Sequence, residues 1–268
     1  MRFPTLFVSH GGGPWPWMQD TWHGAYDRLA AALRGLPEEI GARPRAVLMV
    51  SAHWEAEEFT VQSNPAPGMI YDYGGFPAHT YSIRYPAPGS PGLAQRVRAL
   101  LGASGIASAE DAQRGFDHGM YAPMAVAYPE ADMPTVQLSL RRGLDPEQHL
   151  ALGRALAPLR DEGVLIVGSG LSFHNLRAFG PAGGPASAAF DHWLDTSLAE
   201  TGAARSAALT AWQSAPSARQ AHPREEHLLP LMVAVGAAED EAAVRDYHED
   251  DFFGALSVSN WRFGEPAR

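Results

Sequence analysis

Histidine is the residue type in this chain whose number and spacing indicate a chemical role, because the sequence has eleven histidines and no cysteine. His10 and His53 directly follow the short apolar runs 5–9 and 46–50, and His174 lies in the loop after the run 164–169. Such runs predict buried strands. In open α/β sheets, ligands bind at the carboxyl ends of the strands. We therefore expect these three histidines to meet at one edge of a sheet.

Two further stretches carry histidines with a chemical pattern. His118 stands in Gly115-Phe-Asp-His-Gly119, where Asp117 could cap a following helix and leave His118 facing a pocket. His222 and His227 are five residues apart, which on a helix separates them by about 140°, so they cannot share one face as the two histidines of a zinc-protease helix do. Pro223 predicts a helix start, with His222 outside the helix and His227 in its first turn.

A single histidine is more often structural than catalytic, so the grouping carries the argument. We interpret five histidines as surface or satisfied core residues: His23, His79, His149, His192 and His248. His10, His53, His174 and His227 together predict a mononuclear metal site built from imidazole, with room for one carboxylate such as Glu226.

The elements that must position these residues alternate along the chain. Apolar runs at 59–63, 135–139, 243–247 and 256–263 predict further strands, and periodic patterns predict helices at 21–36, 90–101, 145–159 and 185–213. This alternation predicts one domain over residues 1–268, a three-layer α/β/α fold around a central mixed, largely parallel sheet. The segment 64–90, rich in Pro, Gly and aromatic residues, is either a binding loop or surface cover.

Composition excludes several classes of protein. The formal charge is −10 and all basic residues are arginines, so a nucleic-acid partner is not expected and Schiff-base chemistry lacks its lysine. The absence of cysteine excludes thiolate nucleophiles and sulfur-ligated metals. No apolar stretch approaches membrane-spanning length, and the N-terminus lacks a signal-like segment, so we expect a cytoplasmic protein without a membrane partner.

Taken in order, the motifs resemble those of the class III extradiol ring-cleavage dioxygenases, of the 4,5-DOPA dioxygenase type related to the protocatechuate 4,5-dioxygenase catalytic subunit. The resemblance spans nearly the whole chain. It is carried by these segments: His10-Gly-Gly-Gly-Pro14, Ser51-Ala-His-Trp54, Tyr73-Gly-Gly-Phe-Pro77, Tyr85-Pro-Ala-Pro-Gly-Ser90, Gly115-Phe-Asp-His-Gly119, Val136-Gln-Leu-Ser139, His174-Asn-Leu-Arg177 and Glu226-His-Leu-Leu-Pro230.

The resemblance implies a metal held by His10, His53 and His227, with His174 as the base and His118 beside it to steer or protonate the oxygen species. It implies Fe(II) for activity, a catechol such as DOPA and O₂ as substrates, and a chain compatible with a homo-oligomer. Zn²⁺, which binds such sites more tightly, is expected in purified protein, with His174 as a fourth ligand. Expected substrate contacts are His222, Trp15, Tyr73 and Arg177, with Tyr71, Phe76 and Trp54 as further pocket candidates.

Two alternatives stay open at this point. A zinc hydrolase would use the same ligands, with Glu55, Glu226 or His174 activating a metal-bound water, and would act without O₂ or iron. A non-catalytic metal-binding relative would show no turnover and a closed site.

Overall fold

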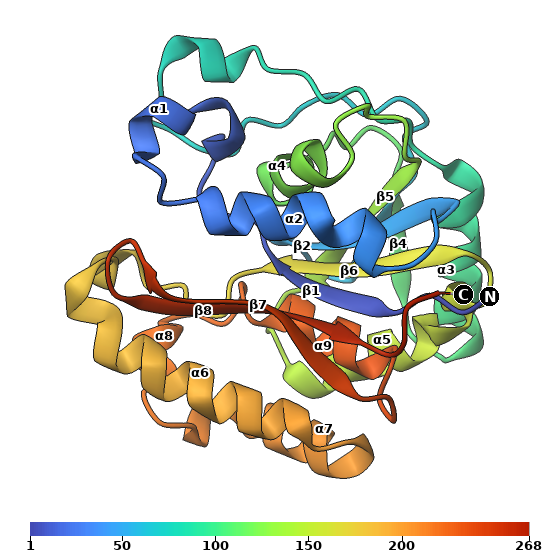
Figure 1. Cartoon of the computed structure of the whole chain (residues 1–268). Coiled ribbons are helices and arrows are strands. Elements are labelled where there is room, and N and C mark those ends of the chain that lie inside the picture. Colours follow the sequence, from blue (N-terminus) through green and yellow to red (C-terminus); the bar gives the residue numbers. More distant parts are fainter. Residues whose placement is uncertain (268) are drawn as a thin grey trace.

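The computed structural model describes residues 1–267, in which eight strands form one mixed sheet (Figure 1). The order across the sheet is β4-β3-β5-β2-β6-β1-β8-β7. The four central strands β5, β2, β6 and β1 are parallel, β3 runs antiparallel to β5, and β8 and β7 are antiparallel. The bounds are β1 Thr5–Ser9, β2 Ala46–Ala56, β3 Phe59–Gln62, β4 Ser108–Asp111, β5 Thr135–Arg141, β6 Val164–Gly170, β7 Ala243–Phe252 and β8 Leu256–Phe263. The predicted mixed, largely parallel sheet is confirmed.

Helices cover both faces of this sheet, as Figure 1 shows. Helices α2 and α4 lie on one face, and α3, α5 and α9 lie on the other. Helix α6 packs on β8, and α7 lies against α5 and α6. The bounds are α1 Gln19–Trp22, α2 Asp27–Glu39, α3 Pro91–Ala103, α4 His118–Ala127, α5 Pro146–Leu156, α6 Gly184–Ala199, α7 Gly202–Thr210, α8 Ala218–Ala221 and α9 Leu229–Gly236. The three layers predicted from the sequence are therefore present.

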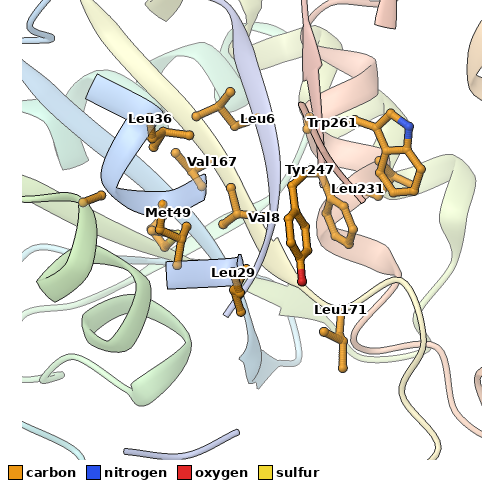
Figure 2. Close-up of a cluster of buried hydrophobic side chains, with 14 of the residues drawn as sticks. Leu6, Val8, Leu29, Leu36, Met49, Val167, Leu171, Leu231, Tyr247 and Trp261 are labelled. Carbon is orange, nitrogen blue, oxygen red and sulfur yellow. The ribbon is translucent and has the colours of Figure 1, made fainter. Parts of the chain in front are cut away.

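The alternation of side chains along the central strands explains why the sheet is covered twice. Successive strand residues point to opposite faces. Val8, Met49 and Val167 from three neighbouring strands pack with Leu29 and Leu36 of α2 (Figure 2). Their neighbours Leu48, Val50 and Ile166 belong instead to the core formed with α3, α5 and α9. Both faces of the parallel strands are thus covered by apolar cores. Polar functional side chains are therefore left to the ends of the strands.

Several predicted boundaries were wrong, and tertiary pairing explains the main one. Strand β2 does not end at residue 50 but continues to Ala56, because it pairs again with β5 after a register shift between Val50 and Glu55. His53 therefore lies inside the strand at this irregularity. The predicted helix 21–36 is two helices, separated where His23 (φ 47°) and Gly24 (φ 83°) adopt left-handed conformations.

The segment before α9 also differs from the prediction. The helix begins at Leu229 with Pro230 in its first turn, so Pro223 does not open it. His222 is the C-cap of α8, and His227 lies in the turn that precedes α9. Strand β4 was not predicted, β7 is longer than predicted, and α5 gives way to a 3₁₀ turn at Ala157. Within the described part of the chain, the helices fall short of the length and apolarity that a bilayer crossing requires.

His149 on α5 is a satisfied core histidine, as predicted. Its Nδ1–H donates to the Asp145 carbonyl (2.7 Å) and its Nε2 accepts from the Arg141 N–H (3.3 Å), so the ring is neutral and fully paired. Burial lowers the pKa of His149 to about 4. The unfolded chain, with a histidine pKa near 6.5, then binds the extra proton between about pH 6.5 and 4, and stability is lost as pH falls through this range.

The variant His149→Gln should therefore flatten the pH dependence of stability. From a folded pKa of about 4, His149 accounts for a loss of about 2 kcal/mol in the free energy of unfolding between pH 7 and pH 5. Urea unfolding at both pH values measures this slope for the wild type and the variant. His79→Gln, at an exposed position, is the control and should keep the wild-type slope. An unchanged slope in His149→Gln would contradict the assignment.

Candidate metal centre

Three imidazole nitrogens converge on one point at the carboxyl edge of the sheet. His53 Nε2 lies 3.0 Å from His10 Nε2 and 3.3 Å from His227 Nε2. Nitrogens bound tetrahedrally to one ion at about 2.1 Å would be roughly 3.4 Å apart. The three rings therefore fit one first-row metal ion, with neutral nitrogen donors and no sulfur.

The backbone explains why residues so distant in sequence meet here. Strands β1, β6 and β2 are parallel neighbours, with Ser9 beside Gly170 and Ser51 beside Ser169. His227 is held at the end of β6, because the Leu171 N–H donates to the His227 carbonyl (3.1 Å). A Cβ at Gly170 would stand 2.1 Å from that carbonyl oxygen, so only glycine permits the approach.

Helix α4 reaches the same point through a second close approach. A Cβ at Gly119 would lie 2.4 Å from Ser51 Oγ and 3.1 Å from the His53 ring. Glycine thus lets the first turn of α4 bring His118 against His53, with the two ring centroids 3.9 Å apart. Asp117 stands at the N-cap but makes no capping bond; its carboxylate instead accepts from Ser51 Oγ (2.7 Å) and Gln137 Nε2 (2.9 Å).

Each of the three converging rings has an acceptor at its other nitrogen. Nδ1 lies 3.1 Å from Ser169 Oγ in His10, 3.4 Å from Asp72 Oδ2 in His53, and 3.0 Å from Glu226 Oε1 in His227. The Ser169 hydroxyl donates to the Gly119 carbonyl and therefore accepts from His10. All three rings thus carry the proton on Nδ1 and leave an Nε2 lone pair for a metal.

The protonation states agree with this arrangement. Burial, together with the neighbouring histidines, holds the pKa of His10 and of His227 well below the ordinary value. Burial and then His118 lower the pKa of His53 to about 4. At neutral pH the three imidazoles are uncharged, which is the state that binds metals.

Two carboxylates each join a converging histidine to a candidate catalytic histidine. Asp72 Oδ1 lies 2.9 Å from His118 Nδ1, and Glu226 Oε1 lies 3.3 Å from His174 Nδ1. Burial acts to raise the pKa of Asp72 and of Glu226, but the hydrogen bonds from His118 and His174 outweigh it and the pKa of each is lowered. Both carboxylates are therefore anionic. Asp72 was missed at the sequence level, where only its place in the aromatic loop 64–90 gave a signal.

The variant Asp72→Asn should weaken metal binding by roughly 10- to 100-fold, the usual effect of losing an outer partner of a metal-binding histidine. The Asp72 backbone is open to solvent but the Asp72 side chain is only 18% exposed, so the isosteric amide of asparagine keeps the packing. Competition titration with a chromophoric chelator measures the affinity. Asp132→Asn, in an exposed ion pair with Arg43, is the matched control. Wild-type affinity in Asp72→Asn would show that Asp72 does not orient His53.

A cavity of about 320 Å³ opens above the three nitrogens. Five histidines and the glycine turn form its floor, and apolar rings form its walls. The lining residues are His10, Gly11, Gly12, Gly13, Trp22, Tyr26, His53, Phe76, His118, Leu171, His174, Leu176, Phe179, His227, Phe252 and Phe253. All five histidines that the resemblance assigned to metal and catalysis thus face one space.

The four predicted substrate contacts are not among these lining residues. Trp15 is buried beneath the glycine turn and donates its Nε1–H to the His10 carbonyl (2.7 Å), so it positions His10. His222 is fully buried against Phe190 and near the Ser172 carbonyl, to which its Nε2 donates (3.0 Å). Tyr73 packs its ring 5.8 Å from His118, and Arg177 is exposed.

Of the other aromatic candidates, Phe76 lines the cavity. Trp54 instead carries the Arg114 guanidinium on its ring, and the Tyr71 hydroxyl donates to the Ile83 carbonyl. The wall residues that the sequence reasoning missed are Trp22, Tyr26, Leu176, Phe179, Phe252 and Phe253. They come from three separate segments, and no spacing pattern connects them.

An α/β sheet with a cluster of histidines at its carboxyl edge, beneath a largely apolar cavity, is an arrangement typical of a metal-dependent enzyme that acts on a small molecule. Residues 4–259 match the family model for the catalytic LigB subunit of aromatic ring-opening dioxygenase. The chain belongs to this family. It is an extradiol aromatic ring-opening dioxygenase, whose substrates are a small molecule and O₂.

Relatives with similar sequences support this placement. The chain is 43% identical to the 4,5-DOPA dioxygenase extradiol of Beta vulgaris, over 97% of this chain and 96% of that protein. It is 34% identical to the protein of the same name from Escherichia coli, over 98% and 95% of the two chains. The crystal structure of an uncharacterized protein from Escherichia coli K12 superposes with a TM-score of 0.76 at 31% identity, covering 98% of this chain and 100% of that one.

Proposed function

We propose that this enzyme opens a catechol ring next to its diol at one Fe(II) held by His10, His53 and His227. The observation that carries the proposal is the convergence of the three Nε2 atoms, 3.0 and 3.3 Å apart, on the floor of a cavity that two further histidines also face. When bound, Fe(II) lowers the proton affinity of the catechol oxygens and passes electrons to O₂, which Zn²⁺ cannot do.

His174 is proposed as the base. Its ring stacks on His227 with centroids 3.3 Å apart and an interplanar angle of 15°, and its Nδ1 faces Glu226. Its Nε2 is therefore the atom that accepts a catechol proton. Because the carboxylate remains anionic, it stabilises the resulting imidazolium.

His118 is proposed to steer or protonate the oxygen species on the other side of the site. Its ring lies 5.4 Å from that of His10, and Asp72 stands behind its Nδ1. The apolar wall excludes water from the ring being opened, which limits side reactions. His174 and His118 thus reach the centre from two different elements: His174 from the loop after β6 and His118 from the start of α4.

The metal bound in purified protein is a separate proposal. Imidazole nitrogens suit both iron and zinc, and zinc binds them more tightly than Fe(II) in the usual order. We expect Zn²⁺ in protein purified without added iron. His174, whose ring stacks on that of His227, would then turn toward the ion as a fourth ligand.

The test is anaerobic reconstitution with Fe(II), followed by a catechol and ¹⁸O₂. The relatives' names point to DOPA as the first catechol to examine. We expect a yellow semialdehyde product, with both labelled atoms in it by mass spectrometry. A single incorporated atom, or cleavage between the two hydroxyl-bearing carbons, would falsify the extradiol assignment.

Two of the three candidate bases of the zinc-hydrolase alternative are already engaged by other side chains. Glu55 is held in a two-pronged ion pair by Arg224 (both contacts 2.5 Å), and Glu226 faces His227 and His174. Hydrolysis of an ester or amide without O₂ or iron would support the zinc-hydrolase alternative. A lack of any turnover would favour the non-catalytic relative.

Further expectations from the sequence remain proposals. We propose that residues 1–268 act as one catalytic domain in the cytoplasm, without nucleic-acid or membrane partners. The sheet draws its strands from both ends of the chain, which supports the single domain. Size-exclusion chromatography with light scattering tests the homo-oligomer.

A further inference from the structure

We infer that the catechol opened by this enzyme carries an uncharged hydrocarbon group, alkyl or aryl, rather than an amino-acid side chain or a carboxylate. The inference rests on the proposed function and names its substrate class. It follows from the wall of the cavity above the histidines, from the charges around it and from the backbone of one wall residue.

Aromatic and aliphatic side chains from four segments form most of the wall. Trp22 comes from α1, Phe76 from the loop 64–90, Leu176 and Phe179 from the segment after β6, and Phe252 and Phe253 from the β7–β8 hairpin. These rings pack on one another. The ring centroid of Phe253 lies 5.9 Å from that of Trp22 and 5.4 Å from that of Phe179, and the centroid of Phe76 lies 6.5 Å from that of Trp22. An aliphatic or aromatic substituent entering this space would lose only apolar hydration, which favours binding.

Charged partners for a zwitterion or an acid are absent from this wall, whose described lining residues include no Arg, Asp or Glu. Arg224, predicted to hold a carboxylate, is engaged by Glu55 and also lies 3.5 Å from Glu226. Arg177 is exposed and is not among the lining residues. An ammonium or carboxylate buried against this wall would therefore lose its hydration without a charged partner there, which is strongly unfavourable.

The overall charge adds to this preference. The formal charge of the whole chain is −10, which does not favour the approach of an anionic substrate.

The backbone at Phe253 shows that this wall is maintained at a conformational cost. Phe253 has φ 50° and Gly254 has φ 86° in the turn between β7 and β8, a hairpin position where Asn or Gly is ordinarily found. A bulky residue at positive φ is a strained exception. The ring placed there packs on Tyr26 and Phe252, 5.4 and 4.8 Å away, and closes the apolar side of the cavity.

The volume is consistent with a substituted ring. Ligand pockets in proteins span about 300 to 1,000 Å³. At about 320 Å³, the cavity stands at the lower end of this range, with room for one ring and a short substituent.

The first experiment compares three catechols of similar length on the Fe(II)-reconstituted enzyme: 4-propylcatechol, 3-(3,4-dihydroxyphenyl)propanoic acid and DOPA. We expect kcat/KM for 4-propylcatechol to exceed that for the other two by at least about tenfold. Equal or higher kcat/KM for DOPA or for the acid would overturn the inference.

A binding measurement separates this inference from the proposed function. Calorimetry of the same three catechols with metal-loaded enzyme under anaerobic conditions should give the lowest Kd for 4-propylcatechol. If no catechol is opened in air, the proposed function fails, but the order of Kd values still decides the substrate class. A lower Kd for the acid or for DOPA would contradict the inference by itself.

Variants at the rim test the role of charge directly. Leu176 lines the cavity and is 69% exposed, so Leu176→Arg can add a cation without disturbing the core. We expect it to lower KM for the propanoic acid by at least about fivefold relative to 4-propylcatechol. Leu176→Gln removes the same apolar contact without adding charge and should not produce this gain.

Val244→Arg is the matched control for the added charge. Val244 is 42% exposed and lies eight residues along β7 from Phe252, roughly 26 Å at the usual rise of a strand. It should keep the wild-type preference among the three catechols. If Leu176→Arg shows no more effect than Val244→Arg, the lack of a cation at the rim does not set the substrate class and the inference is wrong.

Discussion

His53→Ala is expected to lose stoichiometric metal. His53 Nε2 lies between the other two converging nitrogens, 3.0 Å from that of His10 and 3.3 Å from that of His227, so its removal leaves a two-nitrogen site. Loss of an outer partner alone costs roughly 10- to 100-fold in metal affinity, and loss of a direct ligand should cost more than about 100-fold. Ring-opening activity should disappear with the metal.

Plasma emission analysis of the purified variant, after dialysis against a weak chelator, measures the metal content per chain. Circular dichroism checks that the fold is retained, since the His53 side chain is only 21% exposed. His79→Ala changes an exposed histidine and should keep the wild-type metal content. Full occupancy in His53→Ala would remove this residue from the set of ligands.

His174→Gln is expected to separate metal binding from chemistry. Glutamine approximates the size of the ring and can still face Glu226, which lies 3.3 Å from His174 Nδ1, but it cannot accept a proton from the catechol. Turnover of the Fe(II) form should fall by roughly 10²- to 10⁴-fold, the usual contribution of general acid–base catalysis, while most of the iron is retained.

Steady-state kinetics and iron analysis on the same preparation provide the two measurements. His192→Gln, at an exposed position on α6, is the control for a histidine-to-glutamine change. Complete loss of iron in His174→Gln would make His174 an essential ligand. A wild-type rate would exclude it from both roles.

The results for His53→Ala and His174→Gln together distinguish the residues that bind the metal from those that transfer protons. His53 approaches the Nε2 atom of His227, whereas His174 stacks on the face of the His227 ring. Asp72 faces His53, and Glu226 faces both His227 and His174. Asp72→Asn should lower the metal affinity as His53→Ala does, but by a smaller factor. A change at Asp72 that left affinity intact but reduced turnover would instead place its action on His118.

The sequence by itself determined the central strands and the histidines that follow them. Apolar runs such as 5–9 and 164–169 are local signals, because a strand buried on both faces needs continuous hydrophobic side chains. Parallel strands bring their carboxyl ends to one edge, so the position of His10 and His174 after such runs is enough to predict that they lie together. The motifs around His118 and His227 supplied the rest of the histidine cluster through the family resemblance.

Only the tertiary structure decided which other residues join the site. Asp72 reaches His53 and His118 across the fold, and Phe179 meets Phe253 from 74 positions away, with no periodicity to connect them. Trp15 and His222 have suitable chemistry for a substrate contact, yet packing buries both outside the cavity wall. Burial and the direction of a side chain depend on neighbours that are distant along the chain. Local pattern therefore specified the metal-facing edge of the sheet, while long-range packing specified the wall that faces the substrate.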